Sequence, residues 1–219
     1  MSSILEDLFS PWESKVTTKP AELVVHPFKV IHRDDHEPVT IINPDMEKGP
    51  WIAGGAVLRW YQNQPVGESD IDVFCANAKQ AADVVNAVKS QGRYSVKYES
   101  ENAVTLSHWA KENPSKSWTI QIITRRHFVN MKDVLDNFDI TVCQVGTAGD
   151  EYVLGKTTAK DIREKNLQFN RPLQPDALKR LVKYWTYGYR PVDGLLEDIQ
   201  NNPNAVWKFE LDGDYQNAF

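Results

Sequence analysis

The feature that most constrains this chain is the segment at residues 54–74, which reads GGAVLRWYQNQPVGESDIDVF. Two glycines open a stretch whose apolar residues, at helical spacing, predict one short helix ending before Pro65 and Gly67. The next stretch, ESDIDVFC at 68–75, is typical of a strand. A glycine pair, a helix and an acidic strand therefore follow each other closely. Because only one short helix separates them, the glycine loop and the start of the acidic strand can lie close together in the fold.

Two aspartates, Asp70 and Asp72, stand two positions apart on this predicted strand. Alternate side chains of a strand share a face, so both carboxylates point the same way, while Ile71 and Val73 point into the core. Two neighbouring carboxylates repel each other, and a hard divalent cation relieves that repulsion. Mg²⁺ usually combines one or two carboxylates with substrate phosphates. The pair therefore predicts a magnesium site for phosphoryl transfer, in which two ions can stabilise the attacking and leaving oxygens.

The glycine pair, Gly54 and Gly55, directly precedes the predicted helix. Glycine lets a phosphate approach the backbone closely, and a helix N-terminus offers unpaired N–H groups and a positive dipole end. We therefore expect an anion cradle and a metal site on the same side of the sheet. Ser69 either orients a phosphate or caps the turn. A lone Gly-Gly is usually a turn and a lone DxD a solvated strand end, so the specific signal is their order and spacing.

The rest of the chain predicts a mixed sheet followed by helices. Helices are predicted at 3–14, 78–92 and 130–138, strands at 21–32, 39–42 and 117–126, and hairpins at 93–110 and 139–155. From about Gly155 the pattern is helical, in segments at 158–166, 175–188 and 191–202, before a polar tail at 210–219. We therefore expect an α+β fold, with a catalytic core at 1–155 and a short helical C-terminal extension at 156–219 packed on it.

Composition and charge narrow the function classes. No apolar run approaches the roughly 20 residues of a membrane span, and acids stand near the start where a secretory signal carries basic residues, so we expect a cytoplasmic protein without a membrane partner. A net charge of −5 argues against broad, non-specific nucleic-acid binding but allows a local basic groove. Cys75 and Cys143 lack metal-ligand spacing and are expected to be buried thiols. The histidines and acids at 32–36 are expected to form a surface loop.

The glycine pair followed by SDIDVF resembles the nucleotidyltransferase superfamily, the group with a DNA polymerase β-like palm that includes CCA-adding enzymes and poly(A) polymerases. The resemblance implies that Gly54, Gly55 and Ser69 bind the triphosphate of an NTP and that Asp70 and Asp72 hold Mg²⁺. It implies transfer of a nucleoside monophosphate to a hydroxyl acceptor with release of pyrophosphate. An RNA 3′ end, such as that of tRNA, is the favoured acceptor, and a protein hydroxyl or a small molecule is the alternative.

Two later segments extend this resemblance. The sequence NFDITVCQV at 137–145 is similar to the RRDFTINA-type segment of CCA-adding enzymes, which makes Asp139 a further catalytic candidate. The helix predicted within 175–191 is similar to the one that presents basic residues near the nucleotide, which implies that Arg180 and Lys183 contact phosphates. The competing interpretation of these two residues is an ordinary solvated helix face.

The chain departs from the family at two places. Gln121 stands on the strand where many members carry a third carboxylate. Either Asp139 serves instead, or two carboxylates suffice, or the protein is catalytically impaired and uses its pocket to bind a nucleotide or a partner. The arginine pair of the RRDFTINA-type segment is replaced at 137–138, which argues against CCA addition itself.

Overall fold

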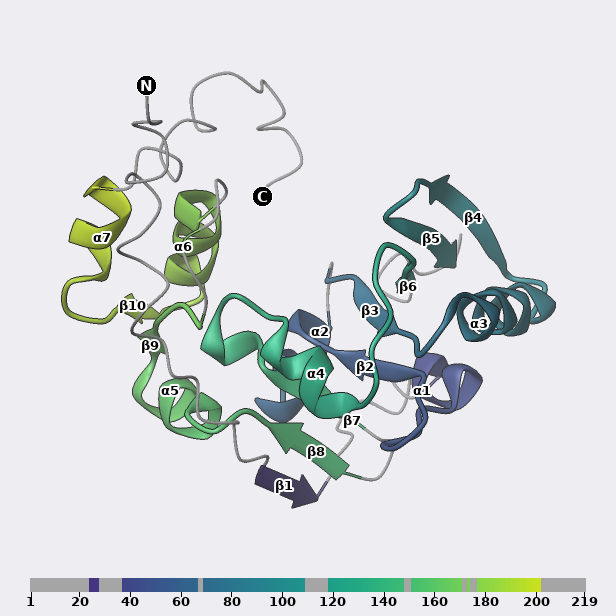
Figure 1. The fold of residues 1–219 in the computed structure, drawn as a ribbon, viewed down its shortest axis with the longest axis horizontal. Coiled ribbons are helices and arrows are strands. Elements are labelled where there is room, and N and C mark those ends of the chain that lie inside the picture. The colour runs from purple at the N-terminus through teal and green to yellow at the C-terminus, as the bar shows by residue number, and fades with distance from the viewer. Residues whose placement is uncertain are drawn as a thin grey trace, which may run out of the picture.

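The computed structural model describes residues 24–27, 37–66, 69–108, 118–147, 151–170, 173 and 177–201. Within them lie an eight-stranded sheet, ordered β1-β8-β7-β2-β3-β6-β5-β4, and a two-stranded sheet, β10-β9 (Figure 1). The strands are β1 (Val24–Pro27), β2 (Trp51–Ala53), β3 (Ile71–Phe74), β4 (Tyr94–Glu99), β5 (Ala103–His108), β6 (Trp118–Ile123), β7 (Val145–Thr147), β8 (Glu151–Leu154), β9 (Asn166–Leu167) and β10 (Arg190–Pro191). The helices are α1 (Glu37–Ile42), α2 (Gly55–Tyr61), α3 (Ala78–Ser90), α4 (Met131–Asp136), the 3₁₀ helix η3 (Thr141–Cys143), α5 (Thr158–Glu164), α6 (Ala177–Thr186) and α7 (Leu195–Asn201).

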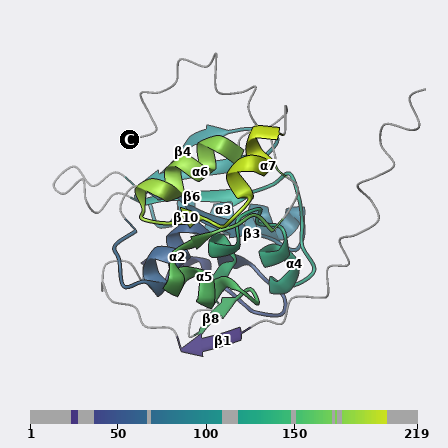
Figure 2. The ribbon, with the colours of Figure 1, turned by 90° about the vertical axis from the view of Figure 1, so that its left-hand side faces the viewer.

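The large sheet is mixed. Neighbouring strands β3 and β6 run parallel, and the other pairs in it run antiparallel. The connection from β3 to β6 contains α3 and the β4–β5 hairpin. Figures 1 and 2 show α6 and α7 together at the end of the molecule that lies away from β1 and β8. This α+β arrangement of a mixed sheet and packed helices confirms the expected fold class.

The two faces of the central strands bury different cores. One face, which includes Ile71 and Val73, joins a large core with residues of α2, α3, α5, α6 and α7. The other face carries Phe74 and packs against α4 through Met131 and Leu135. Asp72 alternates with Ile71 and Val73 on β3 and therefore lies on this second face. Ile71 and Val73 are fully buried, as their predicted inward orientation requires.

Most of the predicted elements are confirmed. The segments at 78–92 and 130–138 form α3 and α4, and 93–110 contains the β4–β5 hairpin. The three helical segments after Gly155 contain α5, α6 and α7, although the short strands β9 and β10 were not anticipated. These helices share their core with the sheet, but the domain boundary at 155 stays a prediction. Cys75 and Cys143 are both buried and unbridged.

One predicted strand is wrong, and another is wrong in its first part. The segment at 39–42 belongs to helix α1, where Val39 and Ile42, three positions apart, are both buried. Pro38 is compatible with the first turn of a helix, and this helical spacing outweighs the β-branched composition. The hairpin predicted at 139–155 is confirmed where β7 pairs antiparallel with β8, but its first strand is shorter than predicted, because residues 139–144 contain an isolated bridge at Ile140 and the 3₁₀ helix η3.

Tertiary contacts explain the second error. The Thr158 hydroxyl, at the start of α5, donates a hydrogen bond to the carbonyl of Thr141 (2.8 Å). The Thr141 N–H donates to the carbonyl of Gln168 (3.1 Å). These partners, distant in sequence, satisfy the backbone of a segment whose composition alone favours a strand.

Some predictions fall outside the described part of the chain. The helix at 3–14, the loop at 32–36 and the tail at 210–219 lie there, as does most of the strand predicted at 21–32, of which β1 is described. None of the helices in the described ranges is both long and apolar enough to cross a membrane.

Candidate active site

The carboxylate pair lies at the beginning of β3. Asp70 directly precedes the strand and is exposed, and Asp72 lies within it and is half-buried. Burial raises the pKa of the Asp72 carboxyl to about 7, and the Asp70 charge raises it as well. Burial also raises the pKa of Asp70. The two acids therefore interact, and holding both ionised without a cation is unfavourable.

Basic side chains on two elements act electrostatically on Asp70 and Asp72. Lys183 on α6 lowers the pKa of both carboxyls, Arg180 on the same helix lowers that of Asp72, and Lys97 on β4 lowers that of Asp70. In Figure 1, α6 and the β4–β5 hairpin lie on either side of α2 and β3. The pair is thus flanked by positive charge from both sides, although the chain as a whole carries a net charge of −5.

Asp139 and Arg180, predicted to have separate roles, form an ion pair. The Arg180 Nη2 atom lies 2.8 Å from Asp139 Oδ1, and the side chains are 33% and 16% exposed. Asp139 stands between α4 and η3, so this contact ties α6 to the segment that follows α4. Arg180 also lowers the pKa of Asp72, so the ion pair links Asp139 to a cation that acts on the carboxylate pair. A direct catalytic role for Asp139 stays a prediction.

The glycine pair bends the chain beside the carboxylates. Gly54 has φ +97° and ψ −148°, its N–H donates to the carbonyl of Val145 (2.8 Å), and its own carbonyl accepts from the Leu58 N–H (2.9 Å). A Cβ atom at Gly54 would lie 3.0 Å from the Phe138 ring and 3.4 Å from Asp72 Oδ2. Gly54 therefore lets the loop pass close to Asp72. Gly55 begins α2, whose first turn has no side-chain cap.

We expect Gly54→Ala to destabilise the fold by roughly 3 kcal/mol, because alanine combines an unfavourable backbone conformation with a close contact to Phe138. Gly92→Ala is the matched control. Gly92 also has a positive φ of +72°, but a Cβ there would meet nothing within 4 Å. Urea denaturation of both variants measures the difference. Equal losses of unfolding free energy would show that the approach to Phe138 and Asp72 does not matter.

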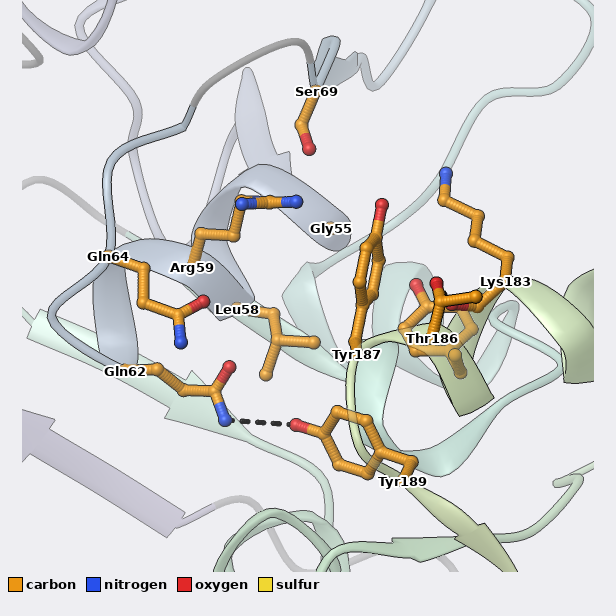
Figure 3. A pocket seen from close by; sticks show the side chains of 11 residues that line it. Gly55, Leu58, Arg59, Gln62, Gln64, Ser69, Lys183, Thr186, Tyr187 and Tyr189 are labelled. Atoms are coloured by element: carbon orange, nitrogen blue, oxygen red, sulfur yellow. Dashed lines mark hydrogen bonds between the residues drawn. The ribbon is translucent and has the colours of Figure 1, made fainter. Parts of the chain in front are cut away.

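A pocket of about 210 Å³ lies between α2 and the C-terminal part of α6. Figure 3 shows its side chains, with Ser69 and Lys183 near one end and Gln62 at the other. Gln62 donates a hydrogen bond from Nε2 to the Tyr189 hydroxyl (3.0 Å). The lining residues are Gly55, Leu58, Arg59, Gln62, Gln64, Ser69, Lys183, Tyr184, Thr186, Tyr187 and Tyr189.

The pocket brings together three residues predicted from sequence, Gly55, Ser69 and Lys183. Ser69 directly precedes Asp70, so the pocket adjoins the carboxylate pair. Two pocket residues were not predicted from the sequence: Arg59 in α2 and Gln62, which caps the C-terminus of that helix. The Arg59 guanidinium lies 5.0 Å from the centre of the Tyr187 ring. Their spacing indicated a helix face, but no local signal indicated that this face meets α6.

The family model described as "Gad2: Gabija anti-defense 2 family protein" matches residues 26–165, which is more than half of the chain. The chain belongs to the Gad2 family. No curated protein matches it by sequence.

The fold of this Gad2-family chain is similar to several solved structures. The Thermotoga maritima CCA-adding enzyme in complex with tRNA matches with a TM-score of 0.56 at 13% identity, covering 83% of this chain and 49% of that one. The Bacillus stearothermophilus CCA-adding enzyme in complex with CTP matches with a TM-score of 0.56 at 17% identity, covering 78% and 44%. A tRNA nucleotidyltransferase complexed with a primer tRNA and an incoming ATP analogue matches with a TM-score of 0.52 at 14% identity, covering 68% and 45%.

These similarities confirm the resemblance stated from the sequence at the level of the fold. The Gad2-family chain has the fold of the nucleotidyltransferase superfamily. It spans less than half the length of each of these three enzymes. At such low identity the likeness concerns the fold alone.

Gln121, the departure noted from the sequence, lies directly beside the carboxylate pair. In the parallel pairing of β3 with β6, Asp72 is opposite Gln121, which is half-buried. Residues opposite each other on neighbouring strands share a face of the sheet. The Gad2-family chain therefore has a neutral amide beside Asp72, which adds no further charge repulsion to the acidic pair.

Proposed function

We propose that this protein is a metal-dependent nucleotidyltransferase that moves a nucleoside monophosphate from an NTP to a hydroxyl acceptor and releases pyrophosphate. One observation carries the proposal. The carboxylate pair Asp70 and Asp72 adjoins a pocket that contains Gly55, Ser69 and Lys183, on a nucleotidyltransferase fold. If the two aspartates were only a chance DxD sequence at a solvated strand end, nothing would lead us to expect a pocket with these residues beside them.

The carboxylate pair suits a hard divalent cation. Burial and the Asp70 charge together raise the pKa of Asp72, so a cation between the two acids relieves an existing repulsion. No cluster of three or more metal-binding side chains occurs among the described residues, so Mg²⁺ held by Asp70 and Asp72 would complete its shell with substrate phosphates and water. Bound there, one or two Mg²⁺ ions supply charge neutralisation for the triphosphate and the attacking oxygen.

The other residues of the site bind and orient the NTP. The backbone at Gly55, the Ser69 hydroxyl and the Lys183 ammonium hold the triphosphate in the pocket. The acceptor hydroxyl attacks the α-phosphorus, a new O–P bond forms as the bond to pyrophosphate breaks, and the hydroxyl proton passes to a carboxylate of the pair. Catalysis of this kind rests mainly on positioning and charge neutralisation.

An RNA 3′ end is the favoured acceptor. The positive charge around the acidic pair, from Lys97, Arg180 and Lys183, suits a polyanion. Two of the similar structures were determined with tRNA bound, which supports the same class of acceptor for this chain. The family description, Gabija anti-defense 2, supports interference with a defence called Gabija as the setting of this proposed activity.

A second function, nucleotide or partner binding without catalysis, is favoured by one observation. Gln121 lies opposite Asp72, so the neighbouring strand contributes an amide where a carboxylate would give a third metal ligand. A protein of this kind would bind an NTP in the pocket without consuming it.

The test is incubation of the purified protein with each NTP labelled at its α-phosphate, Mg²⁺ and total cellular RNA. A double variant, Asp70→Asn with Asp72→Asn, is run beside it. The control, Asp83→Asn with Asp198→Asn, makes the same change of charge at exposed positions of α3 and α7. We expect RNA to be labelled by the unmutated protein and the control only.

Other outcomes decide between the functions. Label on the protein itself, lost in the acidic-pair variant, would retain the transferase and change the acceptor class. No transfer, with melting temperatures raised by an NTP, would favour the binding function. No transfer and no stabilisation by any NTP would remove the transferase and the nucleotide-binding function.

A further inference from the structure

The edge strand β4 contains a β-bulge that changes which of its side chains share a face with the acidic pair. In the antiparallel pairing of β4 with β5, Val96 is opposite Leu106 and Tyr98 is opposite Thr105. Consecutive residues of β5 are therefore matched by β4 residues two positions apart. Lys97 is the extra residue of the bulge, and such bulges re-aim side chains.

The register continues across the sheet to the carboxylates. Thr105 on β5 is opposite Gln121 on β6, and Gln121 is opposite Asp72 on β3. Residues opposite each other share a face, so Tyr98 lies on the face that carries Asp72. With strand spacings of about 4.8 Å, Tyr98 lies roughly 14 Å from Asp72 along this row, a span that a few nucleotides cover.

Without the bulge, strict alternation would place Tyr98 on the opposite face and Glu99 on the face of the acidic pair. The observed register places Glu99 opposite Val104 instead, and Val104 belongs to the core on the other side of the sheet. The bulge thus removes a negative charge from the face of the carboxylates and adds an aromatic ring. The Lys97 charge acts on Asp70, which agrees with this arrangement.

The face around Tyr98 is polar, unlike its reverse, although Thr105, directly opposite Tyr98, is buried. The Tyr98 side chain is 63% exposed. On the same face, Ser107 of β5 is opposite Thr119 of β6, and both are only half-buried. On the reverse face, Val104, Leu106, Ile120 and Ile122 are buried in the core that includes α3. Tyr98 is therefore an exposed ring near small polar side chains, and its neighbour in the sequence, Lys97, is a cation.

We propose that Lys97 and Tyr98 form an acceptor platform, where Tyr98 stacks on a base just upstream of the 3′ end of single-stranded RNA and Lys97 contacts its backbone. The proposal rests on the proposed function, in which the terminal hydroxyl of that strand reaches the acidic pair. Base–aromatic stacking combined with a basic side chain is the usual means of holding single strands. A peptide partner would be expected to need a contiguous apolar patch, and this face has none among the described residues.

The platform is tested by fluorescence anisotropy with a short, dye-labelled single-stranded RNA of mixed sequence, in the absence of NTP. Tyr98→Ala is expected to weaken RNA binding about tenfold, and Tyr98→Phe, which keeps the ring, to bind as the unmutated protein does. Lys97→Gln is expected to reduce the slope of log K against log salt by about 0.7, as for the loss of one phosphate contact with a single strand. Glu99→Gln on the reverse face is the control for charge, and Val96→Ala the control for edge-strand stability.

The outcomes separate this proposal from the proposed function. Equal RNA affinity of Tyr98→Ala and the unmutated protein would overturn the platform, as would preference for duplex RNA or no RNA binding at all. NTP-induced stabilisation of Tyr98→Ala and Tyr98→Phe should equal that of the unmutated protein, because Tyr98 does not line the pocket. Transfer to RNA that does not depend on Tyr98 would retain the transferase and remove the platform. RNA binding that depends on Tyr98, without transfer, would retain the platform and remove the transferase.

Discussion

Asp72→Asn is expected to make the metal-free protein more stable at pH 8 while reducing Mg²⁺-dependent transfer about a thousandfold. Burial and the Asp70 charge raise the pKa of Asp72 to about 7 in the folded state, against about 3.9 in an unfolded chain. The folded protein therefore holds the proton more tightly than the unfolded chain does. Its unfolding free energy falls as pH rises from about 4 to 7, and the full loss persists above pH 7.

Asparagine keeps the shape of the side chain and removes the charge, so the variant avoids this loss. The gain in unfolding free energy at pH 8 is on the order of 2–4 kcal/mol, and it should shrink as the pH falls toward 4. The loss of transfer follows because a metal ligand contributes several kcal/mol of charge stabilisation to such a reaction.

Urea denaturation in a chelating buffer at several pH values measures the stability, and label transfer from an NTP measures the activity. Added Mg²⁺ should stabilise the unmutated protein more than the variant. Asp83→Asn, at an exposed position of α3, should change neither quantity. A stability difference independent of pH, or undiminished transfer, would contradict the assignment of Asp72.

The parts of the site that were predictable from sequence are those with local geometry. Strand alternation predicts that Asp70 and Asp72 point the same way, and it requires the burial observed for Ile71 and Val73. In the structure, Asp70 directly precedes β3 and its charge acts on Asp72. The helix that begins at Gly55 was likewise readable from the periodicity of a few residues. These features require no knowledge of the rest of the fold.

The parts that were not predictable depend on contacts between distant segments. Arg59 and Gln62 look like an ordinary polar helix face until α6 is packed against α2. The position of Tyr98 depends on a bulge, and a bulge is defined only by the strand that pairs with it. Regular alternation along β4 would have put Tyr98 on the wrong face.

The ion pair between Asp139 and Arg180 is another contact between distant segments that could not be predicted from the sequence. Both residues were chosen from sequence, Asp139 as a catalytic acid and Arg180 as a phosphate ligand. The ion pair between them makes these roles dependent on each other, because each charge is now partly neutralised by the other. Both residues could be chosen from the sequence, but only the structure shows that they form an ion pair, so their roles have to be tested together.

A double-mutant cycle on Asp139 and Arg180 is expected to show strong coupling in transfer. Arg180→Met removes the cation that acts on Asp72 and should lower kcat/KM about a hundredfold, with roughly 2 kcal/mol of stability lost because Asp139 is left half-buried without this partner. Asp139→Asn should have a similar effect on kcat/KM, because Arg180 loses the contact that orients it. The double variant should be no worse than either single variant.

The cycle distinguishes positioning from direct participation. If Asp139 acts only by holding Arg180, Asp139→Asn has no further effect once Arg180 is methionine. If Asp139 instead serves as the third carboxylate that Gln121 does not supply, the double variant should lose about another hundredfold in kcat, and its dependence on Mg²⁺ concentration should shift. Lys179→Met, an exposed residue of the same helix, is the control for loss of a positive charge from α6. Coupling in transfer without any shift in Mg²⁺ dependence would therefore place Asp139 outside the metal site and make Arg180 the residue through which it acts.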